Sequence, residues 1–216
     1  VIGLKKIYFI FSLILCIFSF VIQIEATATP DKRIIIDPGH GGRDGGASAN
    51  GLLEAEINLE ISLRLKSVFE EKGYMVDLTR EDNNDLCDGD FIKRSDMNQR
   101  VKKINSGNYL CCISIHQNTF SDSKYRGAQT FYSDSNSSSK ELALNVQNSI
   151  KYYLNNTTRD IVKRTNVYLL NKVSIPAILI ECGFLTNAEE AKLLKTYEYQ
   201  KTLAYSIYYG CVKSLA

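Results

Sequence analysis

Three continuous apolar runs constrain the fold of this chain more than any other feature. The runs are "RIII", "YLCCISI" and "IPAILI", which begin at Arg33, Tyr109 and Ile175. A strand buried on both faces of a sheet has such a run, whereas a half-exposed strand alternates apolar and polar residues. Segments with helical spacing separate the runs. The pattern predicts an α/β protein with a single domain, in which helices flank both faces of an open, twisted, mostly parallel sheet.

The segments between the runs carry the spacing of amphipathic helices. Ile57, Ile61, Leu65 and Val68 mark one helical face, and Gly73 follows as a natural stop. Further helices are expected over residues 90–105, around 142–153, after Asn187, and around 203–211. Shorter strands are expected at "YMVDLTR", "GAQTFYS" and "VYLL".

The first 28 residues resemble an export signal. Lys5 and Lys6 precede an apolar run from Ile7 to Ile22, and the small-residue triplet "ATA" ends at Ala28. The run is slightly long for a signal core and shorter than the roughly 20 residues that span a bilayer. Residues 1–28 are therefore expected to be a signal peptide cleaved after Ala28, or an uncleaved anchor that attaches the protein to the membrane. Either alternative places residues 29–216 outside the cytoplasmic membrane.

The composition of residues 29–216 excludes some classes of partner. Without Lys5, Lys6 and Glu25, 24 basic residues face 23 acidic ones, so no electrostatic footprint for nucleic acid exists and no nucleic-acid partner is expected. The remaining cysteines form no CxxC pair, and their number is odd. We expect core thiols rather than a disulfide framework. They are Cys87, Cys111, Cys112, Cys182 and Cys211.

Polar residues with metal-binding or acid–base chemistry follow three of the predicted strands. His40 and His116 are the only histidines, and Glu181 comes directly after "IPAILI". In open α/β sheets, ligands bind beyond the carboxyl ends of the strands, so these side chains are expected at one edge of the sheet. A carboxylate at the end of an apolar strand is costly to bury unless it is paired or bound to a metal.

Two histidines and one carboxylate are a common set of ligands for catalytic zinc, which keeps a fourth position for water. Glu54 and Glu56 both open the helix after the glycine-rich loop, and the residues alone leave the choice of the acid open. The alternative is that both histidines are ordinary surface or core residues and that Glu181 caps a helix or pairs with a base. A phosphate-binding loop is not expected, since "DPGHGGRDGG" lacks the required spacing.

Five motifs, in order from about Lys32 to the carboxyl terminus, resemble the zinc-dependent N-acetylmuramoyl-L-alanine amidases of the amidase-3 family. They are "IIIDPGHGG", "GLLEAEINLEIS", "LTR", "CISIHQN" and "IPAILIECGFLTN". The resemblance implies an amidase-3 catalytic domain over residues 29–216, with a twisted sheet flanked by helices and one Zn²⁺ per chain. It also implies hydrolysis of the peptidoglycan amide that joins the lactyl group of N-acetylmuramic acid to L-alanine.

The resemblance also implies roles for individual residues. His40, Glu54 and His116 fall on the family's zinc ligands, and Glu181 falls on its catalytic glutamate. Ala55 replaces a lysine usual in the family, and Gln117 stands where a small residue is commoner. Neither residue is expected to touch the proposed ligands, so the departures bear on fine specificity.

The stretches "KYRGAQTFY" and "TNVYLLNKVSIPAILIECGFL" most resemble the germination-specific CwlD type of this family. That type implies action in spore cortex maturation, where stem peptides are removed so that muramic-δ-lactam can form, on the forespore or cortex side. A bare catalytic domain makes an activating or targeting protein an expected partner beside peptidoglycan. The alternatives are a vegetative autolysin, a non-catalytic cell-wall-binding domain and a carboxypeptidase acting on the same polymer.

Three polar residues near the motifs are candidates for binding the carboxylates of the stem peptide. They are Arg80, Arg100 and Asn118. The alternative for each is an ordinary salt bridge or turn bond.

Overall fold

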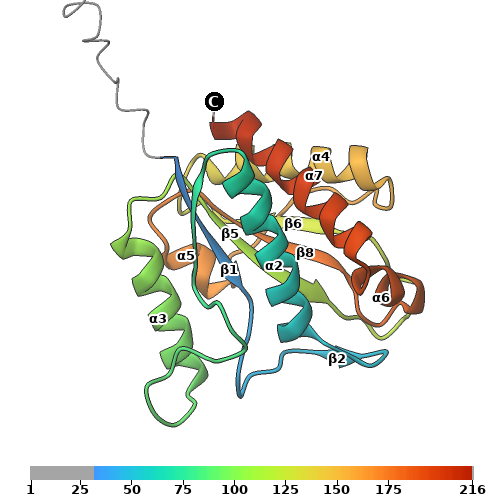
Figure 1. Cartoon of the computed structure of the whole chain (residues 1–216), viewed down its shortest axis with the longest axis horizontal. Helices are drawn as coiled ribbons and strands as arrows, with labels where there is room; N and C mark the ends of the chain where they lie inside the picture. The colour runs from blue at the N-terminus through green and yellow to red at the C-terminus, as the bar shows by residue number, and fades with distance from the viewer. Residues whose placement is uncertain (1–31, 216) are drawn as a thin grey trace, which may run out of the picture. The chain divides into compact units, whose positions relative to one another are not determined.

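The computed structural model describes residues 32–215 (Figure 1). The predicted signal peptide or membrane anchor at residues 1–28 lies outside this part of the chain. Between residues 32 and 215, none of the helices combines the length and the apolar character that crossing a membrane requires.

A six-stranded sheet lies at the centre of the domain, in the order β4-β1-β5-β8-β6-β7. The first four strands in this order are parallel to one another, whereas β6 runs antiparallel to β8 and parallel to β7. The mostly parallel sheet is therefore confirmed. The strands are β1 (Arg33–Pro38), β4 (Met75–Leu78), β5 (Cys112–Asn118), β6 (Gln129–Tyr132), β7 (Val162–Lys163) and β8 (Ala177–Phe184).

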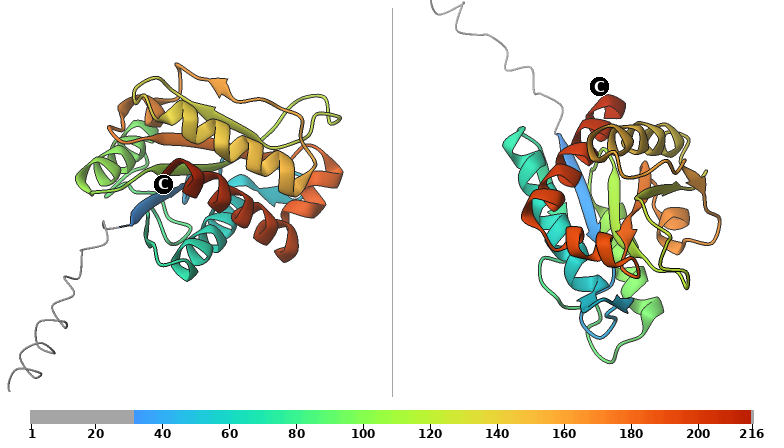
Figure 2. Two further views of the ribbon diagram at one scale, coloured as in Figure 1. Left: turned by 90° about the horizontal axis from the view of Figure 1, so that it is seen from above. Right: turned by 90° about the vertical axis from the view of Figure 1, so that its right-hand side faces the viewer.

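Helices cover both faces of the sheet (Figures 1 and 2). The long helices α2, α4 and α7 lie on one face, and α3 and the short α5 lie on the other. Two-residue strands, β2 (Ser48–Ala49) and β3 (Leu52–Leu53), form a small hairpin directly before α2. The helices are α2 (Glu54–Glu71), α3 (Lys93–Ser106), α4 (Ser139–Leu154), α5 (Tyr168–Lys172), α6 (Ala188–Leu194) and α7 (Tyr197–Leu215).

The two faces of the sheet bury different sets of side chains. Ile34, Ile113 and Ile180 pack into the core beneath α2, α4 and α7. Because successive side chains of a strand point to opposite faces, their neighbours Ile35 and Leu179 pack under α3 and α5. Continued along the strands, the same alternation puts four polar side chains on the α3 and α5 face, toward the carboxyl ends of the parallel strands. They are Asp37, Ser114, His116 and Glu181.

The local expectations have mixed outcomes. The helix start at Asn187 is confirmed, since the Asn187 side chain accepts hydrogen bonds from the N–H groups of Glu189 and Glu190. The strand expected at "VYLL" is wrong: this segment enters α5, and the short strand β7 lies just before it. Leu169 and Leu170 pack as a helical pair into the core beneath α3 and α5, which overrides the β propensity of the segment.

The expectation of core thiols holds for most of the cysteines. The five cysteines within residues 32–215 form no disulfide. All except Cys87 are fully buried.

Candidate metal centre

His40 lies two residues beyond the end of β1, in an unusual backbone conformation. Its φ is 60°, in the left-handed region that side chains other than glycine rarely adopt. The carbonyl oxygen of His40 accepts a hydrogen bond from Arg100 Nη2 at 2.6 Å. Glycine is required at position 39, just before His40, because a Cβ there would lie 2.3 Å from the His116 ring. The turn therefore brings the two imidazoles together, with ring centroids 5.1 Å apart.

Glu54 is the first residue of α2, and its side chain is buried at 5% exposure. Glu54 Oε2 accepts a hydrogen bond from the N–H of Ala47 at 2.9 Å, and Oε1 accepts one from the N–H of Gln117 at 3.2 Å. These bonds fix the carboxylate toward the two histidines. Glu56 is exposed, whereas Glu54 lies close to both histidines, so Glu54 is the better candidate ligand.

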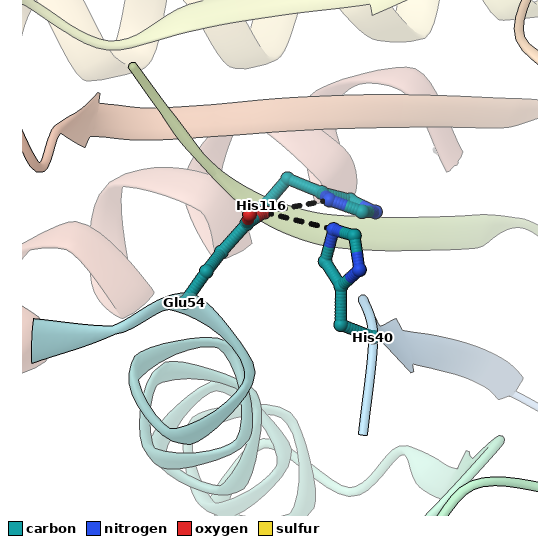
Figure 3. A group of neighbouring side chains, drawn as sticks. All are labelled: His40, Glu54 and His116. Carbon is teal, nitrogen blue, oxygen red and sulfur yellow. Dashed lines mark hydrogen bonds and ion pairs between the residues drawn. The ribbon is translucent and has the colours of Figure 1, made fainter. Parts of the chain in front are cut away.

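The three side chains predicted to hold a metal converge from the turn after β1, from α2 and from β5 (Figure 3). Glu54 Oε1 lies 3.0 Å from His116 Nδ1 and 3.3 Å from His40 Nε2. The three ligand atoms all lie within 4.8 Å of one another. A tetrahedral zinc ion with ligands at about 2.0 Å holds them about 3.3 Å apart, so two imidazole nitrogens and one carboxylate oxygen in this arrangement fit zinc.

The electrostatics of the cluster favour an ionised carboxylate. Burial acts to raise the pKa of Glu54, but hydrogen bonds to His116 and His40 outweigh it and hold the pKa well below its usual value. Burial acts to lower the pKa of His40, and the neighbouring Glu54 and Asp44 raise it overall. The site is therefore a concentration of negative charge that favours binding of a cation.

Asp44 is a part of the site that the sequence motifs did not single out. Its Oδ2 lies 3.0 Å from His40 Nδ1, which leaves the Nε2 of the same ring facing Glu54. Lys93 Nζ lies 3.4 Å from the same oxygen. Histidine ligands in metal sites characteristically direct their second ring nitrogen at a carboxylate. The spacing "HGGRD", with an acid four residues after His40, is the signal that could have identified it.

Glu181 lies on β8 directly beside His116 in the register of the sheet. Its carboxyl is partly buried, and Oε2 has no hydrogen-bond partner within residues 32–215. Burial raises the pKa of Glu181 to about 7, and the neighbouring Glu54 carboxylate acts in the same direction. A carboxyl group of this pKa can both accept and donate a proton near neutral pH. Glu181 therefore lies beside the three-residue cluster, as a group suited to proton transfer.

Arg80 and Arg100 bind other groups of the protein itself. Arg100 is 1% exposed and pairs with Asp37 at 2.9 Å and Asp96 at 2.7 Å. Arg80 donates to the carbonyl oxygens of Gly39 and Ala55 at 2.9 and 2.8 Å. Both guanidinium groups lie beneath the turn that carries His40. Both arginines therefore form internal hydrogen bonds and ion pairs, which was the alternative to binding substrate.

The expectation for Gln117 is corrected, and Asn118 has the turn bond that was its alternative. The backbone N–H of Gln117 donates to Glu54 Oε1, and its side chain is buried and donates to Asn58 Oδ1 at 3.2 Å. Asn118 Oδ1 accepts from the N–H of Thr119 at 2.8 Å. Gln117 contacts the proposed ligand Glu54 through its backbone N–H. The type of residue at position 117 gives no sign of such a contact.

A cavity of about 220 Å³ opens beside the histidines, between α3 and α5. Its lining includes His40, His116, Lys93, Val167 and Leu179. The cavity thus combines an apolar wall with a polar end at the candidate metal centre. That combination is typical of small-molecule and peptide sites.

Comparison with known proteins identifies the family of the chain. The family model described as Amidase_3, N-acetylmuramoyl-L-alanine amidase, matches residues 34–213. A germination-specific N-acetylmuramoyl-L-alanine amidase of Bacillus subtilis is 36% identical over 97% of this chain and 94% of its own length. The amidase LytC of Bacillus subtilis is 34% identical over 84% of this chain, which corresponds to 35% of LytC.

Solved structures match as well. The CwlD amidase from Clostridioides difficile, in complex with the GerS lipoprotein, has a TM-score of 0.79 and 41% identity, over 85% of this chain and 98% of that one. An N-acetylmuramoyl-L-alanine amidase from Clostridium difficile 630 has a TM-score of 0.76 and 32% identity, over 84% and 95% of the two chains. The chain therefore belongs to the amidase-3 family of N-acetylmuramoyl-L-alanine amidases.

Proposed function

We propose that this protein is a zinc-dependent peptidoglycan amidase that hydrolyses the amide between the lactyl group of N-acetylmuramic acid and L-alanine. The observation that carries the proposal is the set of three ligand atoms at zinc-like spacing, next to a carboxyl whose pKa is raised to about 7. Family membership identifies the amide. The geometry supports hydrolysis, since it supplies a metal site and a proton-transfer group side by side.

His40 Nε2, Glu54 Oε1 and His116 Nδ1 would hold the zinc ion. Zinc bound there would activate a water molecule near neutral pH and polarise the scissile carbonyl. Asp44 holds the His40 ring in the orientation that presents Nε2. The N–H groups of Ala47 and Gln117 hold the two oxygens of Glu54, so this ligand is fixed before any metal arrives.

Glu181 is the proposed acid–base group. Its unsatisfied, partly buried carboxylate takes a proton from the attacking water and later delivers it to the nitrogen of the leaving alanine. General acid–base catalysis of this kind contributes on the order of 10²- to 10⁴-fold in rate. A pKa near 7 suits both halves of this cycle.

The test is digestion of purified peptidoglycan with and without a chelator, followed by mass analysis of the products. Release of L-alanyl peptides that stops with chelator and returns with Zn²⁺ is the expected result. Release of D-alanine would instead identify a carboxypeptidase, and the absence of any product would identify a binding domain. Cleavage that continues in the presence of chelator would refute the zinc proposal.

We further assign this amidase to spore cortex maturation, on the forespore or cortex side of the cell wall. The germination-specific relative, which matches almost end to end, supports this role. A sporulation-specific amidase of Bacillus subtilis is also 28% identical over 80% of the chain. The alternative is a vegetative autolysin, supported by the match to LytC. Spores of a strain lacking the protein are expected to contain cortex without muramic-δ-lactam, whereas a defect confined to vegetative wall turnover would favour the alternative.

We also propose that an activating or targeting protein assists this catalytic domain at the membrane surface. Support comes from the structural neighbour that is in complex with a lipoprotein. Residues 1–28, as signal peptide or anchor, would deliver the domain to that surface. Comparing the mass of the exported protein with that of the full chain tests whether the leader is cleaved after Ala28.

A further inference from the structure

Arg164 lies on the same face of the sheet as Glu181, and its guanidinium group is not bonded to other groups of the described chain. Arg164 directly follows β7, and its backbone N–H donates to the carbonyl oxygen of Tyr132 at 2.8 Å, which continues the β6–β7 pairing. Its guanidinium lies over the ring of Phe131, with Cζ 4.9 Å from the ring centroid. Within residues 32–215 the guanidinium forms no ion pair and no hydrogen bond. It therefore has free N–H donors and a fixed apolar support.

Phe131 places this arginine on the same face of the sheet as Glu181. Phe131 is paired with Leu179 in the antiparallel register of β6 and β8, and Gln129 is paired with Glu181. Side chains two residues apart on a strand share a face. Phe131 and Leu179 both pack in the core under α3 and α5, so Glu181 lies on that face too. The Arg164 guanidinium thus stacks on a side chain that lies two residues along the sheet from the proposed acid–base group.

Three other cations of this region are already neutralised or bonded, and Arg94 on α3 stacks instead on the Tyr168 ring of α5. Lys93, which lines the same cavity as Leu179, faces Asp44. Arg159 donates to the carbonyl oxygen of Arg126 and to Gln129 Oε1. Arg100 is held by two buried carboxylates. Arg164 is an exposed positive charge available to a ligand, stacked on Phe131 next to Leu179, which lines the cavity.

A guanidinium group stacked on an aromatic ring recognises a planar anion such as a carboxylate, with two parallel hydrogen bonds. In peptidoglycan the N-acetylated glycan is uncharged, and the carboxylates lie on the stem peptide. A step of two residues along a strand is about 7 Å, and two residues of extended peptide reach about the same distance. A carboxylate on the second residue of the stem, one residue beyond the L-alanine at the scissile bond, is displaced by about the step that separates Glu181 from the Leu179–Phe131 pair beneath Arg164.

We propose that Arg164 is a specificity-determining residue that binds the α-carboxylate of the second stem residue and thereby selects acidic over amidated stem peptides. This inference rests on the proposed amidase function. It adds a peptide-side contact to a site whose metal and acid–base groups lie around the scissile bond.

The experiment uses two synthetic muropeptides with the stem L-Ala-γ-D-Glu-L-Lys and an amidated C-terminus. They differ only in the α-carboxylate of the second residue, which is free in one and amidated in the other. The wild-type zinc enzyme is expected to prefer the acidic muropeptide by about 10-fold in kcat/KM, mainly through KM, as expected for one exposed charge-assisted contact. Arg164→Gln is expected to lose this preference, and Arg164→Lys to retain part of it.

Lys163→Gln is the matched control. Lys163 is the adjacent cation on β7 and pairs with Asp134, so its replacement removes the same charge without reaching the cavity. This variant is expected to keep the wild-type preference. Equal kcat/KM for the two muropeptides in the wild type, or an equal loss on both in Arg164→Gln, would overturn the proposal.

The two proposals fail in different ways. If neither muropeptide is cleaved, the amidase function fails, and calorimetric titration of the same two muropeptides still tests Arg164. A dissociation constant about 10-fold lower for the acidic muropeptide, abolished by Arg164→Gln, would support the contact. Equal dissociation constants would refute it.

Discussion

Replacing Glu181 by glutamine is expected to slow cleavage strongly and, in the metal-free protein, to increase stability at neutral pH. The carboxyl is partly buried and Oε2 has no hydrogen-bond partner among the described residues, so its ionised form is disfavoured. Burial raises its pKa from 4.5 to about 7. Glutamine has a similar shape and carries no charge at any pH. The variant therefore avoids the cost of ionising the buried carboxyl, and it also loses the proton-transfer group.

The size and sign of the effect follow from the two pKa values. Below about pH 4.5 the carboxyl is protonated in both the folded and the unfolded chain, and the charge contributes nothing. Between pH 4.5 and 7 only the folded chain keeps the proton, so the wild type loses stability as the pH rises. A difference of about 2.5 between the pKa values corresponds to about 3 kcal/mol, because each pKa unit is worth about 1.4 kcal/mol. Burial of the glutamine amide also changes the free energy of unfolding, by an amount that does not depend on pH.

The assay is urea unfolding of the chelator-treated wild type and Glu181→Gln at several pH values from 4.5 to 8. The free energy of unfolding of the variant, relative to wild type, is expected to increase by about 3 kcal/mol across this range. For a domain of this size, that is about 2–4 °C in Tm for each kcal/mol. Glu81→Gln is the control, since Glu81 is an exposed acid in a loop and its replacement removes no buried carboxyl.

The catalytic half of the prediction is measured on the zinc-loaded proteins. Glu181→Gln is expected to bind zinc as the wild type does and to cleave peptidoglycan about 10²- to 10⁴-fold more slowly. A stability difference that stays constant from pH 4.5 to 8 would refute the raised pKa. Wild-type cleavage by the variant would refute the acid–base role, independently of the first result.

Three further predictions concern the support of the metal centre. A Cβ on Gly46 would lie 2.6 Å from Glu54 Oε2 and 2.8 Å from His40 Cδ2, so Gly46→Ala is expected to lower zinc affinity at least about 10-fold by calorimetry, and unchanged affinity would contradict the described geometry. Asp44→Asn is expected to lower zinc affinity about 10- to 100-fold in a competition titration, with little change in Tm of the metal-free protein. Arg100→Met leaves two buried carboxylates without their partner, so urea unfolding is expected to show a loss of about 3–5 kcal/mol, and a loss below about 1 kcal/mol would mean that the network is dispensable.

The central parallel strands could be located from the sequence, because each contains an apolar run. Their exact ends could not, since β5 and β8 continue past His116 and Glu181 to Asn118 and Phe184. The apolar runs alone nevertheless assign His116 and Glu181 to one edge of the sheet. The direction of β6 could not be predicted, because apolar content does not distinguish a parallel from an antiparallel strand.

The helical phase of α2 distinguishes Glu54 from Glu56. Glu54 lies three residues before Ile57 and seven before Ile61, so it continues the apolar stripe of α2, whereas Glu56 does not. Only an acid on that stripe points toward the sheet. Helical phase is therefore a signal in the sequence that identifies the candidate ligand without reference to any family.

The roles of Arg80 and Arg100 could not be read from the sequence. Their hydrogen-bond acceptors include the carbonyl oxygens of Gly39 and His40, which are 41 and 60 residues away along the chain. A guanidinium that binds substrate and one that binds distant backbone carbonyls have the same local sequence signature. Only the folded chain shows which carbonyls come within reach.

The candidate site is assembled from residues that lie far apart along the chain, from His40 after β1 to Glu181 on β8. A growing or partly exported chain therefore has no complete site until β8, which carries Glu181, has emerged and inserted beside β5. β8 is a central strand, so its insertion completes the sheet and the site in the same event. The chain is thus expected to become able to hydrolyse peptidoglycan only when the fold is complete. This delay protects the cell wall while the enzyme is being made.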